Sequence, residues 1–308
     1  MVPLKLIHTM AREVRHVIGK KGPAPYILIA PSILVLLFMI GYPLVYGINL
    51  SFTNMNLMHF LKYKYVGLTN YQGILTDTEF YTTALRTVVW TVVNVALTVT
   101  IGVFLAILLN RKLPAKNVFR VLLMLPWAVP QYIAVLTWRN MFQAQYGTID
   151  IILNKIGITN VAWLSDPFWT FIACIITNIW LGVPFMMVIA LGAMQSIPFE
   201  MYEAAEMDGV KSWTKHFNIT IPLLKPVMVP AIMLSTVWTF NMVNVIFMMT
   251  GRTGDNQTQI LVSRVYRDAF TYFNYSKAAT FSVIIFLILA VFAMYFIKTM
   301  KGGEGVYE

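Results

Sequence analysis

The sequence predicts an all-α membrane protein that crosses the bilayer several times. Of its 308 residues, 58% are hydrophobic and only 12% are charged, and the mean hydropathy is +0.68. Apolar runs of about 20 residues recur along the chain, and a helix of that length spans the roughly 30 Å hydrocarbon core. Because lipid offers the backbone no hydrogen-bond partners, such runs cross as helices that satisfy their own backbone groups.

The apolar runs predict six transmembrane helices, with ends defined to within a few residues. One membrane domain, 26–300, holds them, and a short tail, 301–308, follows it. The segment 1–25 is basic with apolar residues at helical spacing, so it is either an amphipathic helix on the membrane surface or a solvated tail. The expected spans are 26–50, 84–109, 119–142, 168–194, 226–250 and 278–297.

The distribution of Lys and Arg predicts the orientation. With the N-terminus inside the cell, most of the 23 basic residues fall in the inner segments, as the positive-inside rule expects. Both termini are therefore expected in the cytoplasm. The same distribution accounts for the net charge of +10, so no nucleic-acid partner is expected. Cys174 is the only cysteine, which excludes an intrachain disulfide.

Three segments fall outside the cell in this orientation: 51–83, 143–167 and 251–277. The last two contain amphipathic pieces, TIDIILNKIG and ILVSRVYRDAFTYF. These segments either contact a soluble external partner or lie at the membrane interface, and the pattern favours neither.

The densest charge of the chain lies between the fourth and fifth spans, at 197–226. Good helix formers with acidic residues in the first turn predict a short helix over 200–207, and Gly209 is suited to end it with a positive φ. A second short helix is expected over 211–217, stopped by Pro222 and Pro226, which lead into the fifth span.

Two interpretations of this segment remain open from the pattern alone. Its charges suit a solvated loop that stays out of lipid. Trp213 and Phe217, with the small Ala204 and Ala205, suit instead a docking element for a cytoplasmic protein, because aromatic anchors and close backbone approach are typical of interfaces.

The same segment resembles the EAA motif of permease subunits of bacterial ABC importers. YVGLTNY at 65–71, LPWAVPQ at 125–131 and the TG…T pattern at 250–258 fit the sugar-permease branch of that family. The resemblance covers nearly all of 25–300, favours the MalF-type subunit, and implies the type I ABC importer permease fold. The motif reads Glu203-Ala204-Ala205, Asp208-Gly209 and Pro222, with Val210 where the family usually has Ala.

The resemblance implies a mechanism and partners. The EAA segment would sit in a cleft of a separate ATPase subunit and transmit its closure to the spans, switching the cavity between inward-facing and outward-facing states. The implied partners are a MalG-type permease, two ATPase subunits, an extracytoplasmic sugar-binding protein and membrane lipid, at the cytoplasmic membrane of a prokaryote. The residues carried over for ATPase coupling are Tyr202, Glu203, Ala204, Ala205, Asp208, Gly209, Phe217 and Pro222.

The sequence contains no catalytic motif. It has no GxxxxGK[ST] phosphate loop, so the chain is not expected to hydrolyse ATP alone, and no HExxH, GxSxG or Cys/His cluster. We expect no catalytic residue, no metal site and no cofactor in this chain, with ATP and Mg²⁺ bound by the partner ATPase subunits.

Polar residues inside spans mark either a binding site or hydrogen bonds between helices, and the pattern leaves both open. In the fourth span Asn178, Gly182 and Phe185 share one helical stripe, and Gly182 with Pro184 predicts a locally irregular helix. In the fifth span, residues 241 and 244 are both Asn and are spaced to share a helical face.

The resemblance to maltose-type permeases implies that these positions form a sugar site, with Trp180 and Trp238 as further neighbours. Phe185 stands where the maltose permease has Tyr, which leaves the sugar itself open. Because no Lys or Arg falls deep in a span, a neutral sugar or oligosaccharide is expected rather than an anion such as glycerol phosphate. The matching residues are Asn178, Leu181, Gly182, Phe185, Phe240, Asn241 and Asn244.

Three alternatives stand beside this interpretation. A secondary transporter would need intramembrane Asp, Glu or His for ion coupling, and these spans have almost none. A membrane enzyme would need a nucleophile grouped with a base. The chain could also be chiefly the structural half of a permease pair, with the sugar held by its partner.

Overall fold

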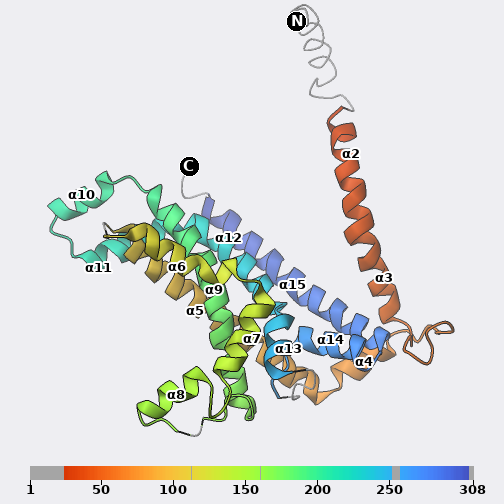
Figure 1. The fold of residues 1–308 in the computed structure, drawn as a ribbon. Coiled ribbons are helices and arrows are strands. Elements are labelled where there is room, and N and C mark those ends of the chain that lie inside the picture. Colours follow the sequence, from red (N-terminus) through yellow and green to blue (C-terminus); the bar gives the residue numbers. More distant parts are fainter. Residues whose placement is uncertain (1–23, 112, 160, 252–256, 305–308) are drawn as a thin grey trace, which may run out of the picture.

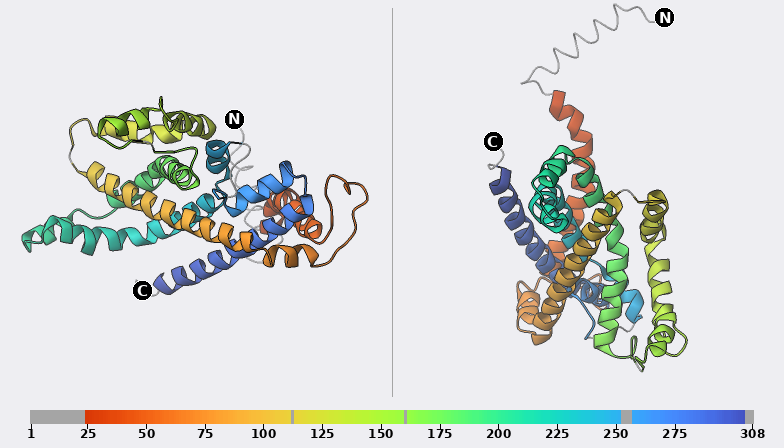
Figure 2. Two further views of the ribbon diagram at one scale, coloured as in Figure 1. Left: turned by 90° about the horizontal axis from the view of Figure 1, so that it is seen from below. Right: turned by 90° about the vertical axis from the view of Figure 1, so that its left-hand side faces the viewer.

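The computed structural model describes residues 24–111, 113–159, 161–251 and 257–304, and there the chain is mostly helical (Figures 1 and 2). The expected N-terminal segment lies outside the described residues up to position 23, as do positions 305–308 of the expected tail. In chain order the elements are α2 (Ala24–Leu36), η1 (Leu37–Gly41), α3 (Tyr42–Ser51), α4 (Thr69–Leu75), α5 (Thr78–Asn110), α6 (Lys116–Ala128), α7 (Gln131–Met141), α8 (Thr148–Lys155), α9 (Pro167–Gln195), α10 (Glu200–Met207), α11 (Ser212–Lys215), η2 (His216–Thr220), α12 (Ile221–Phe240), α13 (Val243–Thr250), α14 (Leu261–Phe270) and α15 (Tyr275–Glu304), where η denotes a π-helical turn.

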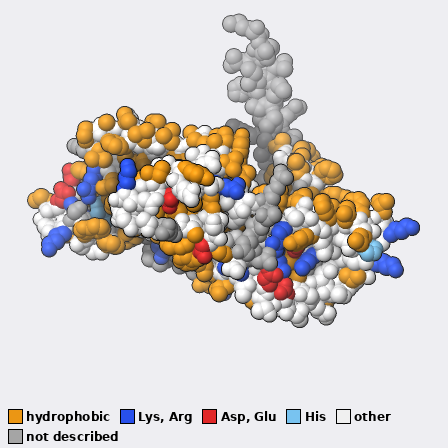
Figure 3. Space-filling model, turned by 60° about the horizontal axis from the view of Figure 1, so that its bottom comes forward, with side chains coloured by type: hydrophobic (Ala, Val, Ile, Leu, Met, Phe, Trp, Pro, Cys, Tyr) orange, Lys and Arg blue, Asp and Glu red, His pale blue; other side chains and the backbone are white. Residues whose placement is uncertain are grey.

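The described residues contain five or six candidate spans, against the six that the sequence predicts. Five helical stretches are long and apolar enough to cross a membrane, and the bent pair α6 and α7 brings the number to six when it is counted as one span. Apolar side chains also cover much of the face that Figure 3 shows. The five stretches are Pro25–Ser51, Thr78–Asn110, Pro167–Gln195, Trp213–Thr250 and Tyr275–Lys298.

Two spans are longer than the apolar pattern indicates. α5 begins at Thr78 rather than near 84, because Asp77 caps it: its Oδ1 accepts a 2.9 Å hydrogen bond from the Glu79 backbone N–H. α15 continues to Glu304, past the expected end near 297 and into the expected tail. The apolar pattern marks the part of a helix that faces lipid, whereas capping decides where the helix begins.

The first span stands apart from the rest of the subunit (Figure 1). α3 packs against α15, but none of the most apolar window of the span is buried within the subunit. Phe38, Tyr42 and Tyr46 stack along its exposed side, with ring centroids 6.3 Å apart in each pair. This face is available to lipid or to a neighbouring subunit.

Two spans are interrupted, and the expectation of one continuous helix over 119–142 and over 226–250 is wrong. α6 and α7 meet at an angle of 97°, and α12 ends at Phe240 before α13 begins at Val243. An unbroken run of apolar residues does not reveal such a break, because lipid-facing side chains are apolar on both sides of it.

Local chemistry explains both interruptions. Pro130 lacks an N–H and disfavours helical backbone at Val129, whose ψ of 132° is extended. α12 ends at Asn241, whose Nδ2 donates to the Val237 carbonyl at 2.9 Å and so competes with its own backbone N–H, which is 3.3 Å from the same oxygen. Met242 then leaves the helical region, with φ −78° and ψ 79°.

The helices pack around two main apolar cores, which we call the first and second core. The first unites α7, α13 and the N-terminal half of α9 and includes Val135, Cys174 and Ile246. The second unites α12 with the C-terminal halves of α5 and α9 and includes Met187 and Met228. α5 and α9 pack against each other and contribute to both cores.

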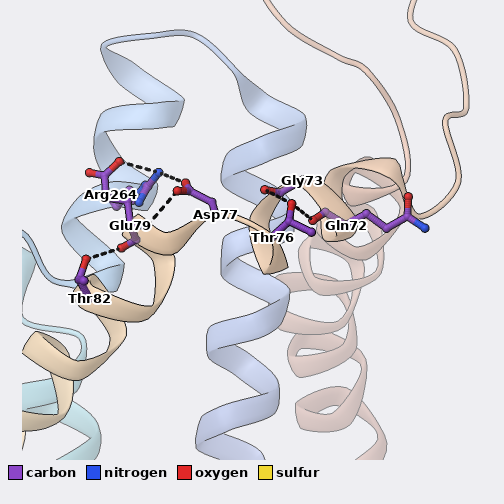
Figure 4. A network of polar contacts seen from close by, with 7 residues as sticks. All are labelled: Gln72, Gly73, Thr76, Asp77, Glu79, Thr82 and Arg264. Carbon is purple, nitrogen blue, oxygen red and sulfur yellow. Dashed lines mark hydrogen bonds and ion pairs between the residues drawn. The ribbon is translucent and has the colours of Figure 1, made fainter.

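The two amphipathic pieces expected in the outer segments are helices, α8 and α14. α14 is fastened to the start of α5 by an ion network (Figure 4). Nη2 of Arg264 lies 2.9 Å from Oδ2 of Asp77 and 3.4 Å from Oε2 of Glu79, and the Arg264 side chain is only 5% exposed. Its Cζ also lies 5.1 Å from the ring centroid of Phe281. This buried guanidinium ties α5, α14 and α15 together.

Candidate substrate pocket and EAA loop

A pocket of about 460 Å³ lies where the interrupted spans meet, bounded by α5, α6, α7, α9 and α12. The two interruptions themselves contribute Val129, Pro130 and Met242 to its wall. The wall combines aromatic side chains with neutral polar ones, and none of the described residues that line it carries a charge.

Three aromatic side chains form one part of this wall. The rings of Trp127 and Phe185 are 5.7 Å apart with 28° between their planes, and those of Phe185 and Trp238 are 5.2 Å apart at 53°. Phe185 therefore lies between two indoles, one from α6 and one from α12. Trp127 and Trp238 are 56% and 49% exposed, so much of their ring surface is available to a ligand.

Asn178 reaches the pocket and also joins two helices. Its Nδ2 donates to Oδ1 of Asn94 on α5 at 3.0 Å, and Nδ2 of Asn94 donates to the Trp90 carbonyl at 2.7 Å. The hydrogen bond between helices that the pattern allowed for is therefore present, on a residue that also lines the pocket. Gln131, Thr98, Ser235 and Thr239 are further neutral hydrogen-bonding groups of the wall.

Gly182 marks a close approach between helices rather than an irregular helix. α9 is a continuous α-helix through Gly182 and Pro184, so the expectation of local irregularity is wrong. A Cβ at position 182 would lie 3.0 Å from Cγ2 of Thr98. Glycine is therefore suited to this position because it lets α5 come close to α9 at the pocket wall.

The stripe predicted on the fourth span comes together in the pocket. Asn178, Leu181, Gly182 and Phe185 all line it, and so does Trp238. Trp180, the other expected neighbour, lies elsewhere on α9, where its ring is 5.8 Å from that of Trp138.

The residues predicted on the fifth span lie beside the pocket rather than in the wall just described. Phe240 is 6% exposed and packs in a third apolar core with side chains of α5 and α15. Because α12 ends at Phe240, Asn241 and Asn244 do not share one helical face, and that expectation is wrong. Nδ2 of Asn244 donates to Oε1 of Gln131 at 3.1 Å.

Sequence reasoning missed Trp127, Gln131 and Asn94 as residues of the site. Trp127 and Gln131 lie in the LPWAVPQ stretch, which carries the family resemblance but no pattern that indicates a pocket. Asn94 was detectable as an amide within the second span, because a polar side chain in a transmembrane helix needs a partner.

The EAA loop, residues 197–226, forms a helical hairpin at one end of the subunit (Figure 1). α10 ends at Met207, Gly209 takes a φ of +71°, and α11 follows, so the predicted helix, glycine turn and second helix are confirmed. The expected stop at Pro222 is wrong, because α11 continues through η2 into α12. The Ile221 N–H bonds to the His216 carbonyl five residues back, and this wider turn accommodates Pro222 at the start of α12.

Two polar contacts hold the hairpin together. Nζ of Lys215 lies 2.6 Å from Oε1 of Glu206, and the hydroxyls of Tyr202 and Thr220 are 3.0 Å apart. Ala205 is the buried residue of α10. α10 is thereby fixed against α11 and η2 as one unit.

An apolar patch on the EAA loop is uncovered in this subunit. Trp213 and Phe217 stack with ring centroids 5.9 Å apart and are 71% and 59% exposed. Met207 and Phe199 of the same loop are also exposed, at 88% and 69%. Exposed aromatic clusters of this kind are typical of protein contact surfaces. The other exposed residues of the predicted coupling set are Glu203, Ala204, Asp208, Gly209 and Pro222.

The family described as "Binding-protein-dependent transport system inner membrane component" matches residues 98–300 of the chain. The chain belongs to this family. The matched range contains the EAA loop and all the described residues of the pocket wall. The expected membrane location of this binding-protein-dependent permease is confirmed.

Two relatives of the permease extend the match over nearly the whole chain. The galactooligosaccharides transport system permease protein GanP of Bacillus subtilis (strain 168) is 32% identical over 312 positions, which cover 96% of this chain and 74% of GanP. The trehalose/maltose transport system permease protein MalF of Thermococcus litoralis is 32% identical over 276 positions, which cover 89% of this chain and 92% of MalF.

A solved structure confirms the fold of the permease. A bacterial ABC transporter involved in the import of the acidic polysaccharide alginate has a chain that superimposes with a TM-score of 0.78 at 18% identity, covering 95% of this chain and 98% of that chain. The expected ABC importer permease fold is therefore confirmed.

Proposed function

We propose that this chain is one membrane-spanning subunit of an ATP-driven importer of neutral sugars or oligosaccharides. The observation that carries the proposal is the pocket wall, where Trp127, Phe185 and Trp238 lie beside neutral amides and hydroxyls, with no charge among the described lining residues. Aromatic rings suit the apolar faces of sugar rings, and amides suit their hydroxyls. The transport systems of the two relatives, for galactooligosaccharides and for trehalose and maltose, support the same substrate class.

The size of the pocket suits a small saccharide bound between two subunits. Its volume of about 460 Å³ falls within the range of about 300–1,000 Å³ that is typical of small-molecule sites. In the proposal a MalG-type permease covers the exposed faces of Trp127 and Trp238 and completes the site. Asn241, Asn244 and Phe240 then contribute as the pocket changes shape during transport.

The proposal places ATP hydrolysis in separate subunits. Two ATPase subunits bind ATP and Mg²⁺, and one of them receives the exposed patch of the EAA loop, with Glu203 and Gly209 at the contact. Both termini and this loop lie in the cytoplasm. α8 lies at the other end of the subunit from α10 (Figures 1 and 2), and an extracytoplasmic sugar-binding protein docks on that side.

Reconstitution of the assembled transporter tests the proposal. The complex with its permease partner, ATPase subunits and binding protein is placed in proteoliposomes, and ATP hydrolysis is measured with neutral mono-, di- and oligosaccharides, acidic oligosaccharides, glycerol phosphate and amino acids. Stimulation by neutral saccharides is expected. Stimulation only by the anions or the amino acids overturns the proposal.

Substitutions in the wall separate a sugar-binding subunit from a structural one. Phe185→Ala and Trp238→Ala each remove a ring from the aromatic wall, and we expect KM for the sugar to rise at least about fivefold, since ring contacts of this kind contribute about 1 kcal/mol. Unchanged KM and unchanged sugar preference in both variants indicate that the partner subunit alone holds the sugar.

A further inference from the structure

A second pocket, of about 430 Å³, lies between the EAA loop and the ends of two spans, and we call it the loop pocket. α5 contributes Asn110 and the Arg111 that follows it, α9 contributes Gln195, and the hairpin contributes side chains of α10, α11 and η2. No described residue lines both this pocket and the candidate substrate pocket. The two are therefore separate, and the proposed function assigns no role to the loop pocket.

The wall of the loop pocket is charged, whereas the described wall of the substrate pocket is not. Arg111 follows α5, Lys215 ends α11 and His216 begins η2, and both cations lie close enough to act electrostatically on the imidazole. Glu206 is the acidic residue among the described lining residues, and it pairs with Lys215 at 2.6 Å. The Arg111 side chain forms no ion pair with any described residue, so its charge is left for a ligand.

Neutral hydrogen-bonding groups complete the wall. The hydroxyl of Thr220 lies 3.0 Å from that of Tyr202 and 3.3 Å from Nδ1 of His216. This network holds the imidazole at the wall, and Nε2 of His216 has no hydrogen-bond partner among the described residues. The amides of Asn110 and Gln195 supply further donors from α5 and α9.

We propose that the loop pocket binds a phosphate group and that the bound phosphate links the EAA loop to the ends of α5 and α9. Phosphate presents oxygens in several directions, which suits a guanidinium, an imidazole and amide donors placed around one pocket. Anionic phospholipid headgroups and soluble phosphate esters both carry this group. The inference rests on the proposed function in placing the loop in the cytoplasm, where both sources occur.

A phosphate in this pocket acts on the path between the EAA loop and the substrate pocket. Bonded to Arg111 on one side and to His216 on the other, it joins the hairpin to α5, and Thr98 of α5 lines the substrate pocket. Motion of the hairpin then reaches that pocket through α5 as well as through α12, which follows η2 directly. Bound phosphate is therefore expected to raise the amount of sugar imported per ATP hydrolysed.

Binding is measured on the assembled transporter without ATP or sugar, so the result does not depend on the transported substrate. Thermal unfolding is followed in phosphatidylcholine nanodiscs as inorganic phosphate or glucose 6-phosphate is added, with acetate at equal ionic strength as the control. In a second arm, phosphatidylglycerol replaces part of the phosphatidylcholine. We expect at least one phosphate source to raise the Tm and acetate to leave it unchanged, because a ligand that binds the folded state stabilises it.

Two matched variants locate the site. Arg111→Gln removes the unpaired charge from the wall, and the concentration of the effective phosphate source needed for half of the Tm shift is expected to rise at least about tenfold. Arg120→Gln makes the same chemical change on α6, outside the described wall, and should respond like the wild type. Comparing the two variants also separates the loop pocket from phosphate bound by the ATPase subunits.

The two arms identify the source of the phosphate. A response to the soluble phosphates assigns the site to a phosphate ester, and a response to phosphatidylglycerol alone assigns it to a lipid headgroup. The inference is overturned if neither arm responds, if acetate acts equally, or if both variants respond like the wild type. If Arg111→Gln does not assemble, His216→Gln is judged by the same shift.

The effect on coupling is measured separately, as sugar imported per ATP hydrolysed in proteoliposomes with and without the effective phosphate source. An unchanged ratio in the wild type overturns the proposed link between the EAA loop and α5. A wild-type transporter that responds to no sugar overturns the proposed function, whereas the nanodisc measurement still decides whether the loop pocket binds phosphate.

Discussion

Nδ2 of Asn178 on α9 donates a 3.0 Å hydrogen bond to Oδ1 of Asn94 on α5, at the wall of the pocket. Both side chains are buried, at 5% and 0% exposed. Replacing either one alone leaves the other amide without this partner, and unpaired buried amides are costly. We therefore expect Asn94→Leu and Asn178→Leu to be less destabilising together than the sum of their separate effects.

The expected coupling is about 0.6–1.7 kcal/mol, the range measured for hydrogen bonds between transmembrane helices. The four proteins of this double-mutant cycle are compared by the free energy of unfolding of the purified complex. Additive losses would show that the bond contributes nothing. Asn178→Leu alone is also expected to raise KM for the sugar, because Asn178 is the member of the pair that lines the pocket.

The second prediction concerns the contact of Gly182 with Thr98. An alanine Cβ at 182 would lie 3.0 Å from Cγ2 of Thr98, whereas at Gly192, on the same helix, it would meet no heavy atom within 4 Å. Gly182→Ala is expected to destabilise the complex by about 1–3 kcal/mol, as overpacking does. Gly192→Ala should be neutral or stabilising, by up to about 1 kcal/mol, because alanine favours helix.

Thermal unfolding of both variants checks this difference, and Thr98→Ala supplies the rescue. Removing the methyl and hydroxyl of Thr98 makes room for the new Cβ, so the double variant Gly182→Ala/Thr98→Ala should recover part of the loss. Equal stability of the Gly182→Ala and Gly192→Ala variants would mean that α5 and α9 do not approach as closely as the structure has them.

The third prediction concerns the glycine turn of the EAA loop. Gly209 and Gly157 have φ values of +71° and +86°, and a Cβ at either would meet no heavy atom within 4 Å. Alanine at each therefore costs about 1–2 kcal/mol through backbone strain alone. Only Gly209→Ala alters the turn between α10 and α11, so we expect it to lower the sugar imported per ATP hydrolysed, while Gly157→Ala leaves that ratio unchanged.

Simultaneous measurement of uptake and ATP hydrolysis in proteoliposomes gives this ratio. Gly209→Asn should be milder than Gly209→Ala, since asparagine tolerates the left-handed region. An equal loss of coupling in Gly209→Ala and Gly157→Ala would attribute the effect to general destabilisation and remove the EAA loop from the coupling path.

The positions of the apolar spans, the hairpin of the EAA loop and the stripe on α9 were all predictable from the sequence. Each depends on a local signal: an apolar run, a glycine that follows good helix formers, or residues spaced by one or two turns. Asn178 and Phe185 consequently lie in the pocket as the pattern indicates.

The interruption of α12 was not predictable, because the residues around Asn241 continue an apolar run that reads as one helix. The contacts that Phe240 and Asn244 make could therefore not be predicted either. Phe240 packs into a core on α5 and α15, and Asn244 bonds to a side chain 113 positions earlier. Contacts between distant segments decide which face of a helix meets the pocket, and a single sequence holds no direct record of them.

The last prediction concerns acid and the ion network of Arg264. Burial alone would raise the pKa of Asp77, but the hydrogen bond from the Glu79 backbone N–H and the charge of Arg264 outweigh it, so the pKa of Asp77 lies below its usual range. A carboxyl with a depressed pKa stabilises the folded state above its unfolded pKa of about 3.9 and loses that contribution as the pH falls through its folded value.

We therefore expect the wild-type complex to lose stability as the pH falls below about 4, and Asp77→Asn to lack this part of the acid dependence. Asparagine can still accept the Glu79 N–H and cap α5, so the helix start is kept while the titrating charge is removed.

Asp166 caps α9 through a 3.1 Å bond from the Trp169 N–H and forms no ion pair among the described residues, which makes Asp166→Asn the matched control. The measurement is Tm against pH for the three complexes. The role of the Asp77–Arg264 pair in acid stability is contradicted if Asp77→Asn follows the wild-type curve, or if Asp166→Asn removes as much of the acid dependence as Asp77→Asn does.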